Sequence, residues 1–199
     1  MTELATAADI GVLILSGGAS LRMHGQDKGL ALFKSKPLVE HVLERVQAQV
    51  PTVRISANRN LEQYTAFGVP VITDATPGPQ GPLVGIYRGL ETNVHTWMAT
   101  VPCDTPFIRL DYIEHLCRAQ QSSQSLSVVA RHAQQIEPLF LLLHHSGLAA
   151  LKRFDPYREQ SVRAWLATLS VAYADFPDDD FTFLNLNTPE QLRAAEQLP

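Results

Sequence analysis

Two glycines and two cations lie close together near the start of the chain. Gly17 and Gly18 follow a short apolar run, and Arg22 and Lys28 follow the glycines. Backbone N–H groups of glycine loops bind oxyanions because no Cβ blocks close approach. Arginine and lysine side chains add positive charge suited to a polyphosphate. The stretch therefore predicts a loop that binds a nucleoside triphosphate whose α-phosphate is attacked, with Arg22 and Lys28 as catalytic charges.

Plainer interpretations of the same residues are a tight turn at the glycines and solvated surface cations after them. The loop has neither the Gly-Lys-Ser/Thr of a Walker A motif nor a G-x-G-x-x-G pattern. Because Arg22, Asp27 and Lys28 share one short segment, phosphate binding is the favoured interpretation.

A carboxylate follows a second apolar run. Asp104 comes after residues 97–103, and Pro102 and Pro106 restrict the backbone around it. Mg²⁺ prefers hard oxygen ligands and usually also takes substrate phosphate oxygens. We therefore expect Asp104 to be a catalytic Mg²⁺ ligand, with Asn185 or Asn187 as a candidate second ligand. The alternative is an ordinary helix cap or turn aspartate.

Other polar side chains have weaker signals. Ser56, Asn58 and Asp74 could bind a base or ribose, or could simply cap turns. His144 and His145 are adjacent on an expected strand, so they point to opposite faces and are poorly placed to chelate one metal. Cys103 has no obvious base nearby in the sequence and is interpreted as a small buried hydrophobe.

Short apolar runs alternate with segments of helical periodicity, which predicts an α/β protein with a mostly parallel sheet. The expected strands cover residues 12–15, 53–56, 69–72, 97–101, 127–130, 138–143 and 171–174. The expected helices cover residues 37–49, 61–67, 83–91, 110–120, 147–154, 161–168 and 189–197, with Pro37 and Pro189 as first residues and Thr188 as the N-cap of the last. A hairpin is expected around residues 133–135. In such sheets the ligand lies beyond the carboxyl ends of the strands, where the candidate site residues all fall.

Composition narrows the class of protein. A chain of 199 residues suits one domain, predicted over 10–199 after a flexible leader at 1–9. The net charge of −4 argues against general nucleic-acid binding. The two cysteines fit no zinc pattern or disulfide framework, and the apolar runs are too short to span a membrane. We therefore expect a cytoplasmic protein that binds neither nucleic acid nor membranes.

The ordered set of motifs closely resembles the molybdenum cofactor guanylyltransferases, the MobA family, from about residue 11 to residue 195. The segments that carry the resemblance are Leu15-Ser16-Gly17-Gly18, Arg22-Met23, Asp27-Lys28-Gly29, Lys36-Pro37-Leu38, Ala57-Asn58-Arg59, Asp74, Gly81-Pro82-Leu83-Val84-Gly85, Cys103-Asp104-Thr105-Pro106 and Asn185-Leu186-Asn187-Thr188-Pro189-Glu190.

The resemblance implies a three-layer α/β/α nucleotidyltransferase fold. It implies that the terminal phosphate of molybdopterin attacks the α-phosphate of GTP, which releases pyrophosphate and forms the guanine dinucleotide. It assigns the nucleotide to Leu15, Ser16, Gly17, Gly18, Lys28, Ser56, Asn58, Asp74 and Asp104. It assigns the pterin side to Gly81, Pro82, Pro138, Asn185 and Asn187. Transient contact with molybdoenzymes or their chaperones is expected as well.

Three positions depart from the family pattern. Ser16 stands where Ala is frequent, His24 where Gly is common, and Ser56 where Asn can occur. Alternatives within the fold are a cytidylyltransferase for the same pterin and a sugar-1-phosphate nucleotidyltransferase. Cytidylyl relatives tend to carry Leu-Ala-Ala-Gly at the loop, whereas Gly17-Gly18 after Ser16 favours the guanine enzyme. The alternative outside enzymes is a GTP- or cofactor-binding protein without turnover.

Overall fold

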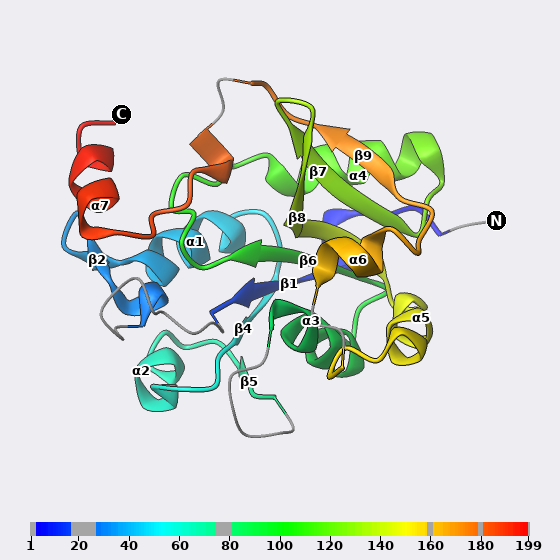
Figure 1. Ribbon diagram of the computed structural model, residues 1–199, viewed down its shortest axis with the longest axis horizontal. Coiled ribbons are helices and arrows are strands. Elements are labelled where there is room, and N and C mark those ends of the chain that lie inside the picture. The colour runs from blue at the N-terminus through cyan, green and yellow to red at the C-terminus, as the bar shows by residue number, and fades with distance from the viewer. Residues whose placement is uncertain (1–2, 17–26, 75–80, 159–160, 179–180, 199) are drawn as a thin grey trace.

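A central sheet of seven strands organises the chain in the computed structural model (Figure 1), which describes residues 3–16, 27–74, 81–158, 161–178 and 181–198. The strand order is β5-β4-β1-β6-β8-β7-β9, and β8 alone among these strands runs antiparallel to its neighbours. The strands are β1 (Ile10–Leu15), β4 (Thr52–Ser56), β5 (Val71–Ile72), β6 (Trp97–Pro102), β7 (Ser127–His132), β8 (Gln135–His144) and β9 (Ala172–Asp175). The predicted, mostly parallel α/β sheet is confirmed.

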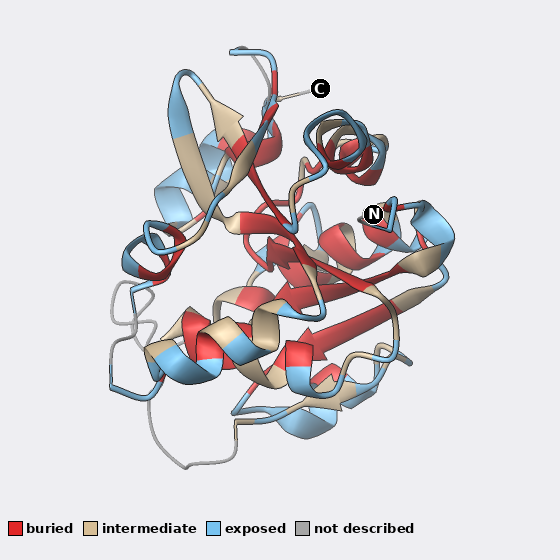
Figure 2. Cartoon of the chain, turned by 90° about the vertical axis from the view of Figure 1, so that its right-hand side faces the viewer, coloured by how far each residue is buried: buried red, intermediate tan, exposed pale blue. Residues whose placement is uncertain are grey.

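The central strands are continuous apolar runs because helices cover both of their faces. All six residues of β1 are buried, and so are all six of β6. In Figure 2 these buried strands lie between helices whose outer sides are exposed. Parallel pairing of β1 with β4 and β6 aligns the carboxyl ends of the three strands, since Leu15 is opposite both Ser56 and Pro102.

Helices form the two outer layers. The helices are α1 (Leu38–Gln47), α2 (Leu61–Thr65), α3 (Pro82–Glu91), α4 (Tyr112–Ser123), α5 (Gly147–Phe154), α6 (Val162–Leu166) and α7 (Pro189–Ala195). One core cluster joins α1 and α4 to the sheet face that carries Val12 and Ile14. A second cluster joins α3, α5 and α6 to the opposite face, which carries Leu13 and Leu15. Alternate residues of β1 thus fill separate cores, as a three-layer sandwich requires.

Two glycines let α3 lie directly on the sheet. A Cβ at Gly89 would be 2.4 Å from Leu13 Cδ2, and a Cβ at Gly85 would be 2.9 Å from Ser56 Oγ. Because a real side chain cannot approach that closely, these positions set the helix-to-sheet distance. The start of α3 is thereby held beside the ends of β1 and β4.

A small third cluster ties the C-terminal segment to the first half of the chain. It contains Phe33, Leu38, Leu186 and Ala195. Phe33 belongs to a hairpin of two short strands, β2 (Leu32–Phe33) and β3 (Lys36–Pro37), which the sequence analysis did not predict. This packing places the segment before α7 next to the chain that follows the glycine loop.

Several local predictions hold. Thr188 caps α7 by accepting from Gln191 N at 3.2 Å, and Pro189 is its first residue. The hairpin predicted near residues 133–135 joins β7 to β8, with Ala133 and Gln134 at positive φ. Pro37 differs from the prediction, because it is the residue before α1 rather than the first residue of the helix.

Residues 3–9, for which the sequence predicts a flexible leader, pack against α4. Ala5 is fully buried, and its N–H donates to Gln120 Oε1 at 2.9 Å. Gln121 Nε2 donates to the carbonyl oxygen of Ala5, also at 2.9 Å. A short 3₁₀ turn, Ala7–Asp9, then leads into β1. Among the described residues, no helix is both long and apolar enough to cross a membrane.

Candidate active site at the carboxyl edge of the sheet

Four parallel strands bring the predicted polar residues to one edge of the sheet. Ser16 follows β1 and its N–H donates to the carbonyl oxygen of Ser56 at 2.8 Å. Asp74 comes two residues after β5, and Asp104 two residues after β6. This grouping follows from parallel pairing, which the sequence analysis predicted. Gly17, Gly18, Arg22 and His24 lie outside the described residues.

A small hollow at this edge collects residues from both predicted groups. It is lined by Leu15, Ser56, Asn58, Asp74, Gly81, Pro82 and Gly85. The first four are the predicted nucleotide residues, whereas Gly81 and Pro82 were assigned to the pterin side. Because α3 begins at Pro82 directly over the ends of β1 and β4, these two residues lie with the nucleotide group.

Asn58 and Asp74 bind each other across the hollow. Asn58 Nδ2 donates to Asp74 Oδ2 at 2.6 Å, and Asp74 N donates to Asn58 Oδ1 at 2.8 Å. Asp74 Oδ1 is buried and has no hydrogen-bond partner among the described residues. Burial raises the pKa of Asp74, against the opposing effects of Asn58 and Arg88. A buried acceptor without a partner is costly unless a ligand supplies a donor.

Lys28, Asp104 and Asn187 meet from three distant parts of the chain. Lys28 Nζ donates to Asn187 Oδ1 and lies 3.9 Å from Asp104 Oδ2. The backbone supports this meeting, since Leu186 N donates to the carbonyl oxygen of Asp104 at 2.9 Å. Burial raises the pKa of the Asp104 carboxyl, and the Lys28 ammonium acts in the opposite direction.

Few protein ligands surround Asp104, which fits a cation whose other ligands are substrate phosphate oxygens and water. Asp104 is one carboxylate, 9% exposed, and no group of three or more His, Cys, Asp or Glu that could hold a metal occurs among the described residues. Mg²⁺ is commonly held by one or two carboxylates together with phosphate oxygens and water. Asn187 Oδ1 already accepts from Lys28, and Asn185 is exposed beside buried Leu186.

Pro138 reaches the same edge because β8 runs in the opposite direction. Thr100 pairs with Leu141 and β6 ends two residues later at Pro102, so the part of β8 from Gln135 to Pro138 extends past the end of β6. Thr100 Oγ1 donates to the carbonyl oxygen of Leu139 at 2.7 Å, which fixes this part of the strand. Pro138 is half-buried there.

The cysteine interpretation agrees with the structure. Cys103 is buried, and burial raises the pKa of its thiol, which disfavours the thiolate needed for nucleophilic attack. The two histidines do not point to opposite faces as predicted, because β8 ends at His144 and the ring centroids of His144 and His145 are 4.2 Å apart. His144 Nδ1 is 2.8 Å from Ser146 Oγ, and burial is the main cause of its lowered pKa.

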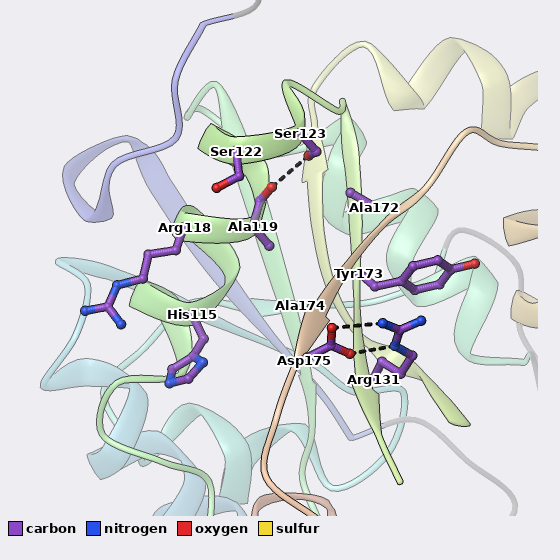
Figure 3. Close-up of a pocket in the computed structure, with 10 residues that line it drawn as sticks. All are labelled: His115, Arg118, Ala119, Ser122, Ser123, Arg131, Ala172, Tyr173, Ala174 and Asp175. Atoms are coloured by element: carbon purple, nitrogen blue, oxygen red, sulfur yellow. Dashed lines mark hydrogen bonds and ion pairs between the residues drawn. The ribbon is translucent and has the colours of Figure 1, made fainter. Parts of the chain in front are cut away.

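A roomier hollow of about 520 Å³ lies between α4 and β9 (Figure 3), and it contains none of the predicted site residues. Its cationic side chains are paired. Arg131 Nη2 donates to Asp175 Oδ2 at 2.8 Å, and Arg118 pairs with Glu114. Figure 3 shows Arg131 directed toward Asp175. The carboxyl edge is therefore the better candidate for the active site.

Residues 12–174 match the MobA-like NTP transferase domain. The chain belongs to this family. It is 39% identical to the molybdenum cofactor guanylyltransferase of Vibrio campbellii over 186 residues, which cover 94% of each chain. It is 37% identical to the molybdenum cofactor guanylyltransferase of Cupriavidus metallidurans over 193 residues, which cover 94% of this chain and 95% of the relative.

Solved structures support the MobA-like fold. Molybdopterin-guanine dinucleotide biosynthesis protein A from Archaeoglobus fulgidus aligns with a TM-score of 0.73 at 24% identity, over 94% of this chain and 96% of that chain. A CMP:2-keto-3-deoxy-manno-octonic acid synthetase complexed with CTP aligns with a TM-score of 0.70 at 16% identity, over 96% and 97%. At such identities the likeness concerns the fold alone, and it confirms the predicted nucleotidyltransferase architecture.

Proposed function

We propose that the protein transfers GMP from GTP to the terminal phosphate of molybdopterin, which releases pyrophosphate and forms molybdopterin guanine dinucleotide. The observation that carries this proposal is the meeting of Lys28, Asp104 and Asn187 at the carboxyl edge of a MobA-like sheet. Relatives of nearly equal length and 37–39% identity are molybdenum cofactor guanylyltransferases.

We assign one hydrogen-bonding group of the nucleoside end of GTP to the hollow beside Asp74, whose volume of about 10 Å³ suits a single polar group. The Oδ1 atom of Asp74 has no hydrogen-bond partner among the described residues and can accept from a base or ribose donor. Asn58 holds the other oxygen, so the carboxylate is fixed before the ligand arrives. Leu15 and the start of α3 at Pro82 supply the walls. Ser56, at the end of β4, adds a short hydroxyl there.

Phosphoryl transfer here needs alignment and charge neutralisation rather than a general base. The attacking phosphate is already ionised at neutral pH. Its oxygen bonds to the α-phosphorus of GTP, and the bond from that phosphorus to the bridging oxygen breaks, so pyrophosphate leaves with the electron pair. We expect Lys28, 3.9 Å from Asp104, to hold phosphate oxygens in line, and Arg22 to add charge. Mg²⁺ held by Asp104 would supply further positive charge to the phosphates.

The acceptor side is assigned to the segment before α7 and to β8. Asn185 and Asn187 lie in the segment before α7, and Pro138 lies in β8. Asn187 Oδ1 accepts from Lys28 Nζ. We therefore expect Asn187 to link the acceptor phosphate to the lysine that neutralises it.

The decisive test is product formation with molybdenum-loaded molybdopterin and Mg²⁺, with GTP and CTP in parallel. We expect pyrophosphate and the guanine dinucleotide from GTP, and neither product from CTP. Turnover with CTP alone would instead support a cytidylyltransferase. Binding of GTP without pyrophosphate release would support a protein that binds nucleotide without turnover.

We also infer that the protein works in the cytoplasm, since Cys103 and Cys117 are both free. Direct transfer of the product to a molybdoenzyme or its chaperone stays a prediction.

A further inference from the structure

Asp27 lies next to Lys28, and both of its carboxylate oxygens accept hydrogen bonds. Its Oδ1 accepts from Tyr64 Oη at 2.6 Å and from Gly29 N at 3.1 Å. Its Oδ2 accepts from Asn60 Nδ2 at 3.0 Å. Both carboxylate oxygens are thus held, and two of the three donors come from the region of α2.

The two donors of the α2 region are set four residues apart. Asn60 precedes α2 in a left-handed conformation, with φ of 52°, and Tyr64 N donates to the carbonyl oxygen of Asn60 at 3.1 Å. Residues four apart on a helix lie on the same side. The first turn of α2 therefore presents an amide and a phenol to the same carboxylate.

Tyr64 also fixes the backbone after Lys28. Its side chain is fully buried, and a Cβ on Gly29 would be 2.4 Å from Tyr64 Oη and 3.3 Å from Cys103 Sγ. The peptide from Asp27 to Gly29 is therefore confined between α2 and the end of β6. With its backbone fixed there, Lys28 extends to Asn187 and Asp104.

We propose that Tyr64 and Asn60 are positioning residues, which hold Asp27 and thereby set where the Lys28 ammonium lies relative to Asp104. Neither residue lines the hollow beside Asp74. The Tyr64 hydroxyl also lies near the Ser16 side chain, so the Lys28→Ala background separates an effect through Lys28 from an effect through Ser16. This inference rests on the phosphate role of Lys28 given under Proposed function. Burial also raises the pKa of Tyr64, so its phenol remains a donor at neutral pH.

The test compares kcat and KM for GTP in Tyr64→Phe, Lys28→Ala and the double variant. Tyr64→Phe keeps the ring against Gly29 and removes only the hydroxyl. We expect kcat to fall about tenfold with little change in KM, because a small displacement of a charge-neutralising group slows the chemical step. In the Lys28→Ala background we expect no further fall in kcat.

Tyr112→Phe is the matched control. Tyr112 is as buried as Tyr64, and its hydroxyl donates to the carbonyl oxygen of Thr100 at 2.9 Å. Both Phe variants lose one buried hydrogen bond, so their melting temperatures should fall by similar amounts. Only Tyr64→Phe should lose kcat. Asn60→Gly, which keeps the left-handed backbone and removes the amide, should move kcat in the same direction as Tyr64→Phe.

Three results would overturn the inference. Equal kcat in Tyr64→Phe and Tyr112→Phe would show that the phenol serves stability alone. A tenfold fall that persists in the Lys28→Ala background would show that Tyr64 does not act through Lys28. Full kcat in Lys28→Ala would remove the phosphate role of Lys28 itself, and with it the basis of this inference. Loss of kcat in Lys28→Ala but not in Tyr64→Phe would leave the proposed function intact.

Discussion

Asp104 is a carboxylate held where its charge is disfavoured. Burial raises its pKa, and Lys28 at 3.9 Å offsets only part of that effect. Such a group costs stability when it is ionised, and carboxylates with a pKa perturbed in this way are typical of functional sites. Sequence reasoning found Asp104, Lys28 and Asn187, because all three lie in recognisable motifs. It could not find Asn60 and Tyr64, since their role depends on a contact with Asp27 from 33 and 37 residues away.

The raised pKa of Asp104 predicts the direction in which the free energy of unfolding changes with pH. The folded state binds the carboxyl proton more tightly than the unfolded state does. The stability that this supplies is present below the ordinary pKa of 3.8 and is lost as pH rises through the raised pKa. The free energy of unfolding of the wild type, minus that of Asp104→Asn, should therefore decrease from about pH 3 to about pH 8. Urea unfolding of both proteins across that range measures the difference.

Asp175→Asn is the control with the opposite sign. Arg131 lowers the pKa of Asp175, so its contribution is present at neutral pH and is lost on acidification. The corresponding difference for Asp175 should be small, because the pair is exposed, and should increase with pH. A difference for Asp104 that also increases with pH would contradict the account of its burial.

At the scale of elements, the regular strands and helices follow from apolar patterning, while the exceptions follow from tertiary contacts. β1 and β6 are buried on both faces and read as unbroken apolar runs. The hairpin of β2 and β3 has strands of two residues, and Leu32 is exposed, so the sequence carries no periodic signal there. β5 is likewise shorter than its apolar run, because only Val71 and Ile72 pair with β4.

Gly89 tests how closely α3 lies on the sheet. Gly89→Ala would place a Cβ 2.4 Å from Leu13 Cδ2 and 2.9 Å from Met98 Sδ. Overpacking of this kind should lower the free energy of unfolding by about 1–3 kcal/mol, measured by urea unfolding. Gly147→Ala in α5 is the control, because a Cβ there meets nothing within 4 Å. Equal stability of the two variants would argue against close packing of α3.

At the scale of the whole molecule, distant segments complete both the fold and the site. The C-terminal segment brings Asn187 to Lys28, 159 residues away in the sequence. The N-terminal segment packs on α4 through Ala5 and Gln120, which are 115 residues apart. The sequence predicts a loose leader for residues 1–9, because one buried alanine leaves no periodic pattern in so short a segment.

Removal of residues 1–9 should therefore destabilise the protein without affecting turnover. Two hydrogen bonds to Ala5 and the burial of its side chain would be lost. We expect the free energy of unfolding to fall by about 1–2 kcal/mol, as measured by urea unfolding, with kcat unchanged. An unchanged stability would support the loose leader instead.

The most direct measurement for the account is pyrophosphate release by Asp104→Asn with GTP, molybdenum-loaded molybdopterin and Mg²⁺. Loss of the carboxylate should lower kcat by about a hundredfold or more, while the protein stays folded. Asp175→Asn, at the edge of the hollow between α4 and β9, should keep the rate of the wild type. Near wild-type turnover in Asp104→Asn would contradict the placement of the reaction at the carboxyl edge of the sheet.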